Sequence, residues 1–168
     1  LLLLARPALT ADQARRATEF SRRIVDWETF KRIALEHQGL PLVFRHLLRL
    51  DGAAVPADVL DRMHRLALLL AAQSLRVEAA IRAFQDQCLA PTGARHAFLK
   101  GFPLGARYYE APALRPCRDI DVLVEPGALI PLVLRARRAG YRLCDVEATL
   151  CERDLAAYCR FATDVSIV

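Results

Sequence analysis

The sequence predicts an α+β protein in which an N-terminal helical bundle, residues 1–90, precedes a mixed β-sheet with flanking helices, residues 91–168. Three observations support this prediction. Apolar residues recur at helical spacing through the first part. Strand-like runs then alternate with helical segments, in the order β-α-β-α-β-α-β. The last run begins just before the chain ends, so we expect the sheet to be truncated at its C-terminal side.

The composition bounds the class of protein. The 168-residue chain is 54% hydrophobic, which supports a packed core and argues against disorder. The net charge of +5 is spread over both halves, so it is weak evidence for nucleic acid, which stays open as a partner. The four opening leucines are too few to span a membrane. Five cysteines without metal-ligand spacing predict reduced thiols in a cytoplasmic protein.

Capping residues delimit the predicted helices of the first part. Thr10 is predicted to cap a helix over residues 11–23, and Asp26 is predicted to cap the next one. Pro56 is predicted to open a long helix that runs to about Leu89. Its apolar side chains are predicted to pack against the other helices; they are Leu66, Leu69, Leu70, Leu75, Val77, Ala80, Ile81 and Phe84.

The pattern changes after Gly93, where short apolar and β-branched runs begin. The predicted strands are His96–Leu99, Ile120–Val124, Tyr141–Cys144 and Val165–Val168, and the predicted helices between them are Pro103–Tyr109, Ala128–Ala139 and Arg153–Arg160.

Two carboxylates, Asp119 and Asp121, stand two residues apart at the second strand. Residues with this spacing on a strand point to the same face. The two charges repel unless a cation lies between them, and Mg²⁺ or Mn²⁺ takes oxygen ligands of this kind. The alternative is that Asp119 caps a turn while Asp121 pairs with Arg118 or Arg115. An unpaired carboxylate inside an apolar strand is costly. The metal-binding interpretation therefore has the same weight as the structural alternative.

Lys100 and Gly101 end the preceding strand. A glycine lets backbone N–H groups approach a phosphate closely, and a lysine adds a point charge. Only two of the 24 basic residues are lysines, which sets Lys100 apart from its arginine-rich background. The alternative is a solvated lysine beside a simple turn. Arg118 is predicted to touch phosphates, with ion pairing to the nearby carboxylates as its alternative.

This combination resembles the uncharacterised bacterial nucleotidyltransferase family, a Lys-Gly variant within the DNA polymerase β-like superfamily. The matching segments are Asp26-Trp-Glu-Thr-Phe30, Leu99-Lys-Gly-Phe-Pro-Leu104, Leu114-Arg-Pro-Cys-Arg-Asp-Ile-Asp-Val-Leu-Val124 and Ala139-Gly-Tyr141. The resemblance implies metal-dependent transfer of a nucleotidyl group from a nucleoside triphosphate to an unknown acceptor hydroxyl. It implies that Asp119 and Asp121 are catalytic and bind the metal, and that Lys100, Gly101 and Arg118 contact the nucleotide. Lys-Gly replaces the Gly-Ser turn of the superfamily, which leaves the handling of the nucleotide open.

The superfamily resemblance also implies a third carboxylate on a later strand. Asp145, Glu147 and Asp164 are candidates, and we expect it beyond Val168. A chain without it would turn over slowly or not at all, so the alternative function is a catalytically degenerate binding or regulatory module. A glycosyltransferase with an Asp-x-Asp motif is a third option. It is disfavoured because a strand continues past the pair.

Overall fold

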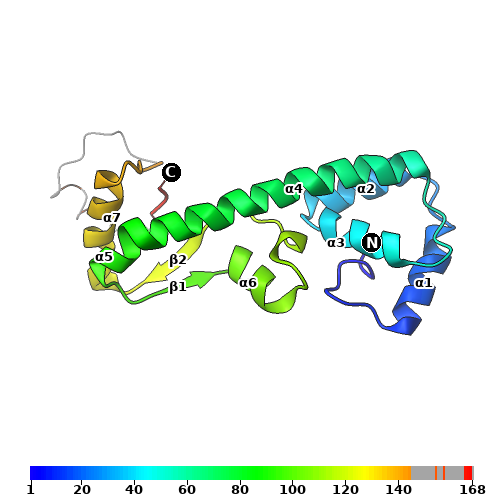
Figure 1. Cartoon of the computed structure of the whole chain (residues 1–168), viewed down its shortest axis with the longest axis horizontal. Coiled ribbons are helices and arrows are strands. Elements are labelled where there is room, and N and C mark those ends of the chain that lie inside the picture. The colour runs from blue at the N-terminus through cyan, green and yellow to red at the C-terminus, as the bar shows by residue number, and fades with distance from the viewer. Residues whose placement is uncertain (145–153, 155–156, 158–164, 168) are drawn as a thin grey trace. The chain divides into compact units, whose positions relative to one another are not determined.

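The computed structural model describes residues 1–144, 154, 157 and 165–167, and the chain divides into two compact units (Figure 1). The first unit joins residues 1–78 to residues 99–121. The second joins residues 79–98 to the described residues of 122–168. The turn after the first strand and the acidic pair therefore belong to the same unit as the N-terminal helices.

Local capping starts the first two helices, as predicted. The helices that precede the long one are α1 (Ala11–Ser21), α2 (Trp27–Glu36) and α3 (Leu40–Arg49). Thr10 and Gln13 form a reciprocal capping box at the start of α1, with N···O distances of 3.0 and 3.3 Å. Asp26 accepts a hydrogen bond of 2.9 Å from the backbone N–H of Thr29 at the start of α2.

The core of the first unit forms between these helices and the first part of α4 (Ala57–Phe84), with Leu40, Val43 and Met63 fully buried. Leu66 and Leu70 pack against this core as predicted. The prediction was wrong for Leu69 and Leu75, which are 67% and 66% exposed, and for Ala80, which is also exposed. Leu75 follows Leu66 by about two and a half helical turns, so it lies on the opposite side of the helix.

The long helix continues past its predicted end at Leu89. A π-helical turn, Gln85–Leu89, follows α4 and leads into the single turn of α5 (Ala90–Thr92). Pro91 has no N–H group to donate to the carbonyl of Gln87. Arg135 supplies the missing donor, because its Nε donates a hydrogen bond of 2.7 Å to this oxygen. Gly93 then ends the helix in the left-handed conformation, with φ at +64°.

The sheet contains the two antiparallel strands β1 (His96–Leu99) and β2 (Asp121–Val124). A 3₁₀ turn, Pro126–Ala128, leads from β2 into α7 (Leu129–Arg138), and α7 packs on the π-turn. Phe84, Cys88, Leu89, Leu132 and Ala136 form the core of the second unit.

The prediction of a third strand at Tyr141–Cys144 was wrong. Leu143 forms one isolated antiparallel bridge with Ile167, and the N–H of Cys144 donates to the carbonyl of Ser166 at 3.0 Å. One bridge does not make the repeated ladder that defines a strand. The predicted helix over residues 153–160 lies outside the described residues except at Asp154 and Ala157, which are helical.

Two further findings bear on the setting of the chain. Across residues 1–144, 154, 157 and 165–167, none of the helices combines the length and apolar content needed to cross a membrane. Among the cysteines that the structure describes, Cys88 and Cys117 are buried, Cys144 is exposed, and all three are free.

Glu110 ties the segment after β1 to the N-terminal helices. This segment forms α6 (Gly101–Tyr108) and a 3₁₀ turn, Pro112–Leu114. Glu110 lies between them and pairs with Arg45 and with Arg49 on α3, where Nη2 of Arg49 lies 3.1 Å from Oε1. The hydrogen bond from Arg49 and the charges of both arginines lower the pKa of Glu110.

Replacing Glu110 with glutamine is expected to make the free energy of unfolding fall less steeply as the pH is lowered. A lowered carboxyl pKa stabilises the folded state above the unfolded value, about 4.3 for glutamate, and this stabilisation is lost as the pH falls through the folded pKa. The measurement is urea unfolding of both proteins from pH 7 down to pH 3. Glu19→Gln removes the same charge from an exposed position on α1, and it should leave the pH dependence of the free energy of unfolding unchanged. If Glu110→Gln also shows the pH dependence of the wild type, the ion pairs of Glu110 do not stabilise the folded state.

Candidate functional site

The predicted site residues gather where β1 ends and β2 begins. The chain leaves β1 at Leu99, passes through Lys100 into α6, and returns at Asp121 as the first residue of β2 (Figure 1). Because the two strands are hydrogen-bonded neighbours, the turn after one lies beside the start of the other. Lys100, Gly101, Asp119 and Asp121 all fall within the first unit.

The turn itself has an unusual backbone. Lys100 has φ +51° and ψ −144°, and Gly101 follows with φ +30°. Glycine adopts positive φ freely, whereas a lysine held there costs about 1–3 kcal/mol and persists only where the surroundings enforce it. Strain of this kind is concentrated at functional sites. Lys100 thus has a conformation that the chain would reach more easily with glycine.

Gly101 lets the turn lie against the segment that carries the acidic pair. A Cβ atom on Gly101 would lie 3.1 Å from Cβ of Cys117 and 3.7 Å from the backbone oxygen of Asp119. Arg115 secures the same contact, because its Nη1 donates a hydrogen bond of 3.1 Å to the carbonyl of Gly101. The glycine turn and residues 115–119 therefore form one packed arrangement.

Asp121 has a cation beside it. Nζ of Lys100 lies 3.3 Å from its Oδ2, with side-chain exposures of 73% for the lysine and 37% for the aspartate. The structural alternative, in which Asp121 pairs with Arg118 or Arg115, was wrong. Arg115 instead donates to a backbone carbonyl, and Arg118 is exposed. The sequence separates Lys100 from Asp121 by a whole helix, and the pair forms only through strand pairing.

Asp119 lies two residues ahead of the strand rather than on it, since β2 begins at Asp121. This corrects the expectation that both carboxylates stand on one strand. Asp119 is exposed and, in the part of the chain that the structure describes, forms no ion pair. Arg118 is likewise exposed beside it. The pair therefore presents one open carboxylate and one that holds an ammonium group.

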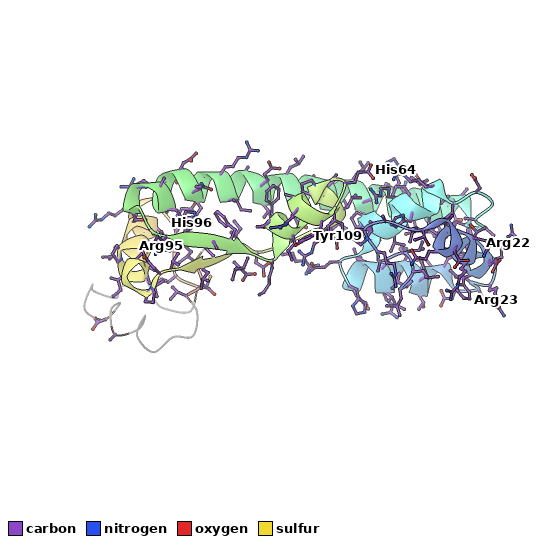
Figure 2. The ribbon with its side chains drawn as sticks, turned by 90° about the horizontal axis from the view of Figure 1, so that it is seen from below. Arg22, Arg23, His64, Arg95, His96 and Tyr109 are labelled. Carbon is purple, nitrogen blue, oxygen red and sulfur yellow. The ribbon has the colours of Figure 1, made fainter. Side chains whose placement is uncertain are left out.

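Sequence reasoning missed Cys117, Arg115 as a backbone anchor, and Glu110. Burial raises the pKa of the Cys117 thiol, and the charge of Asp119 adds to that rise, so the buried sulfur stays neutral beside the glycine turn. No spacing rule signals such a contact, because Cys117 and Gly101 meet only in the folded chain. Tyr109, labelled in Figure 2, directly follows α6 and is half-buried. Tyr108 is exposed, and the guanidinium carbon of Arg107 lies 5.5 Å from the centre of its ring.

A third carboxylate does not join the pair within the described residues. Over residues 1–144, 154, 157 and 165–167, no three His, Cys, Asp or Glu side chains come close enough to hold a metal ion together. The sequence candidates Asp145, Glu147 and Asp164 lie outside the described residues.

The residues present suit a divalent metal ion in their chemistry. The donors are carboxylate oxygens, which Mg²⁺ and Mn²⁺ prefer. The ammonium group of Lys100 already stands as a cation against Oδ2 of Asp121. Gly101 is buried against Cys117, so the exposed part of the turn is the Lys100 side chain.

Comparison with known proteins places this arrangement in a family. No curated protein and no solved structure matches the chain. A family model described as "uncharacterised nucleotidyltransferase" matches residues 24–158. The matched range includes both the Lys100–Gly101 turn and the Asp119–Asp121 pair. The chain therefore belongs to the uncharacterised nucleotidyltransferase family.

Proposed function

We propose that this protein transfers a nucleotidyl group from a nucleoside triphosphate to an acceptor hydroxyl, with Mg²⁺ or Mn²⁺ held by Asp119 and Asp121. The observation that carries the proposal is the packing of the Lys100–Gly101 turn against the segment of the acidic pair, with a cation already at Asp121. We further propose that its sheet is of the DNA polymerase β-like type and that the protein is bacterial and cytoplasmic.

Each residue has one task in this proposal. Asp119 and Asp121 supply carboxylate oxygens to the ion, which neutralises and orients the phosphates when it is bound. The Lys100 ammonium adds charge to a phosphate at the turn, and the backbone N–H of Gly101 donates to it. The next two residues do not contribute, because the N–H of Phe102 bonds to the Cys117 thiol and Pro103 has no N–H. Arg118, exposed next to Asp119, contacts the same phosphates. Positioning and electrostatic stabilisation carry most of the catalysis in phosphoryl transfer, so these contacts are the ones that matter.

A second candidate function is a catalytically degenerate module that binds a nucleotide and regulates a partner. The observation that favours it is the pair of carboxylates without a third among the described residues. The two functions differ in one product. A transferase releases pyrophosphate from its triphosphate, and a binding module does not.

The test is calorimetric titration of the protein with each of the four triphosphates in the presence of Mg²⁺. Asp121→Asn is expected to weaken binding at least about tenfold, because a metal ligand loses its charge. Asp12→Asn removes the same charge from an exposed ion pair on α1 and should bind as the wild type does. Equal binding by wild type and Asp121→Asn would overturn the site. Tight triphosphate binding without release of pyrophosphate would support the second candidate function, the binding module.

A further inference from the structure

We propose that Lys100 is a built-in counter-ion that competes with the metal for Asp121 and leaves when a triphosphate arrives, so that metal and nucleotide enter together. This inference rests on the proposed function and adds an order of events to it. It gives Lys100 two alternative partners, a carboxylate in the empty site and a phosphate in the loaded one.

The contact between Lys100 and Asp121 supports the first half of this exchange. Nζ lies 3.3 Å from Oδ2, so the ammonium group takes space and lone pairs that a metal ion at this oxygen needs. Its positive charge also repels an incoming divalent cation. Removing the ammonium group should therefore strengthen metal binding in the absence of nucleotide.

The exposure of the pair supports the second half. The Lys100 side chain is 73% exposed and Asp121 is 37% exposed, so the bond is weak and solvent reaches it. Lysine carries its charge on a flexible four-carbon stem, which can swing to a phosphate without moving the backbone. Such a phosphate would lie in the solvent-exposed space around the Lys100 side chain.

The backbone conformation of Lys100 indicates that the lysine is present for its side chain and not to stabilise the turn. Lys100 occupies a positive-φ conformation that glycine would adopt without strain. The strained lysine gains no buried contact, because its side chain lies mostly in solvent. Exchange between two charged partners accounts for a lysine at this position.

The test uses the full chain and titrates it with MnCl₂ alone, followed by the electron spin resonance of free Mn²⁺. Lys100→Met is expected to bind Mn²⁺ more tightly than wild type by a factor of up to about five, the upper limit that an exposed ion pair allows. The same variant is expected to bind a triphosphate in EDTA more weakly. A purely structural role for Lys100 would not move the two affinities in opposite directions.

Two variants complete the design. Lys31→Met removes the other lysine, which pairs with Glu28 on α2, and should match the wild type in both titrations. Lys100→Gly removes the ammonium group and also relieves the turn, so it keeps the test valid if the methionine variant folds poorly. It should show the same opposite changes.

The outcomes separate this inference from the proposed function. If Asp121→Asn loses Mn²⁺ binding while both Lys100 variants keep the wild-type affinity for Mn²⁺, the exchange is overturned and the metal site is supported. Absence of Mn²⁺ binding in the wild type and in every variant would overturn both proposals.

Discussion

Replacing Gly101 with alanine is expected to destabilise the first unit by about 3 kcal/mol and to abolish triphosphate binding. The new Cβ atom would lie 3.1 Å from Cβ of Cys117 and 3.4 Å from its Sγ. Cys117 is buried, so it has little room to move aside. The φ of +30° adds strain for any residue with a side chain. Both effects push the turn away from the acidic pair.

Urea unfolding measures the loss of stability, and calorimetry at a low temperature, where the variant stays folded, measures the loss of binding. Gly127→Ala is the matched control. Its added Cβ atom would meet nothing within 4 Å, and its backbone is not in the left-handed region. If Gly101→Ala costs no more than Gly127→Ala, the close approach of the turn to Cys117 is not a constraint.

Replacing Leu89 with alanine is expected to destabilise the second unit by about 3 kcal/mol. Leu89 is fully buried in the π-turn and lies in the core that Phe84 and Leu132 share. The deletion leaves a cavity where α7 packs on the turn. Phe98 on β1 packs against the same core, so amide hydrogen exchange in the sheet should become faster as well.

Leu75→Ala makes the same chemical change on α4, where the leucine is 66% exposed. It is expected to change the free energy of unfolding by less than about 0.5 kcal/mol. A comparable cost for both variants would mean that the exposed side of α4 is covered in solution and that the burial of Leu89 is not what stabilises this unit.

Features fixed by neighbouring residues could be predicted from the sequence. Thr10 and Asp26 cap their helices because each needs only a donor three residues ahead. The bounds of β1 were predicted because an apolar run ends at a glycine turn. The grouping of Gly101 with the acidic pair as a nucleotide site followed from the family resemblance and stays a prediction; the structure shows Gly101 packed on Cys117 and near the backbone of Asp119.

Features that depend on tertiary contacts could not be predicted. The pairing of Lys100 with Asp121 needs two strands to lie side by side, and competing arginines stood much nearer in sequence. The exposure of Leu75 depends on which side of a long helix the other helices cover. The segment around Leu143 has the sequence pattern of a strand, but within the described residues it forms a single bridge with Ile167.

The carbonyl of Gln87 receives its hydrogen bond from Arg135, a residue 48 positions later in the chain. Since Pro91 cannot serve this carbonyl, its hydrogen bond depends on α7, which carries Arg135. Closure of the helix and capture of α7 should therefore be one cooperative event, and a peptide covering residues 57–93 alone should lose helicity from Gln87 onward.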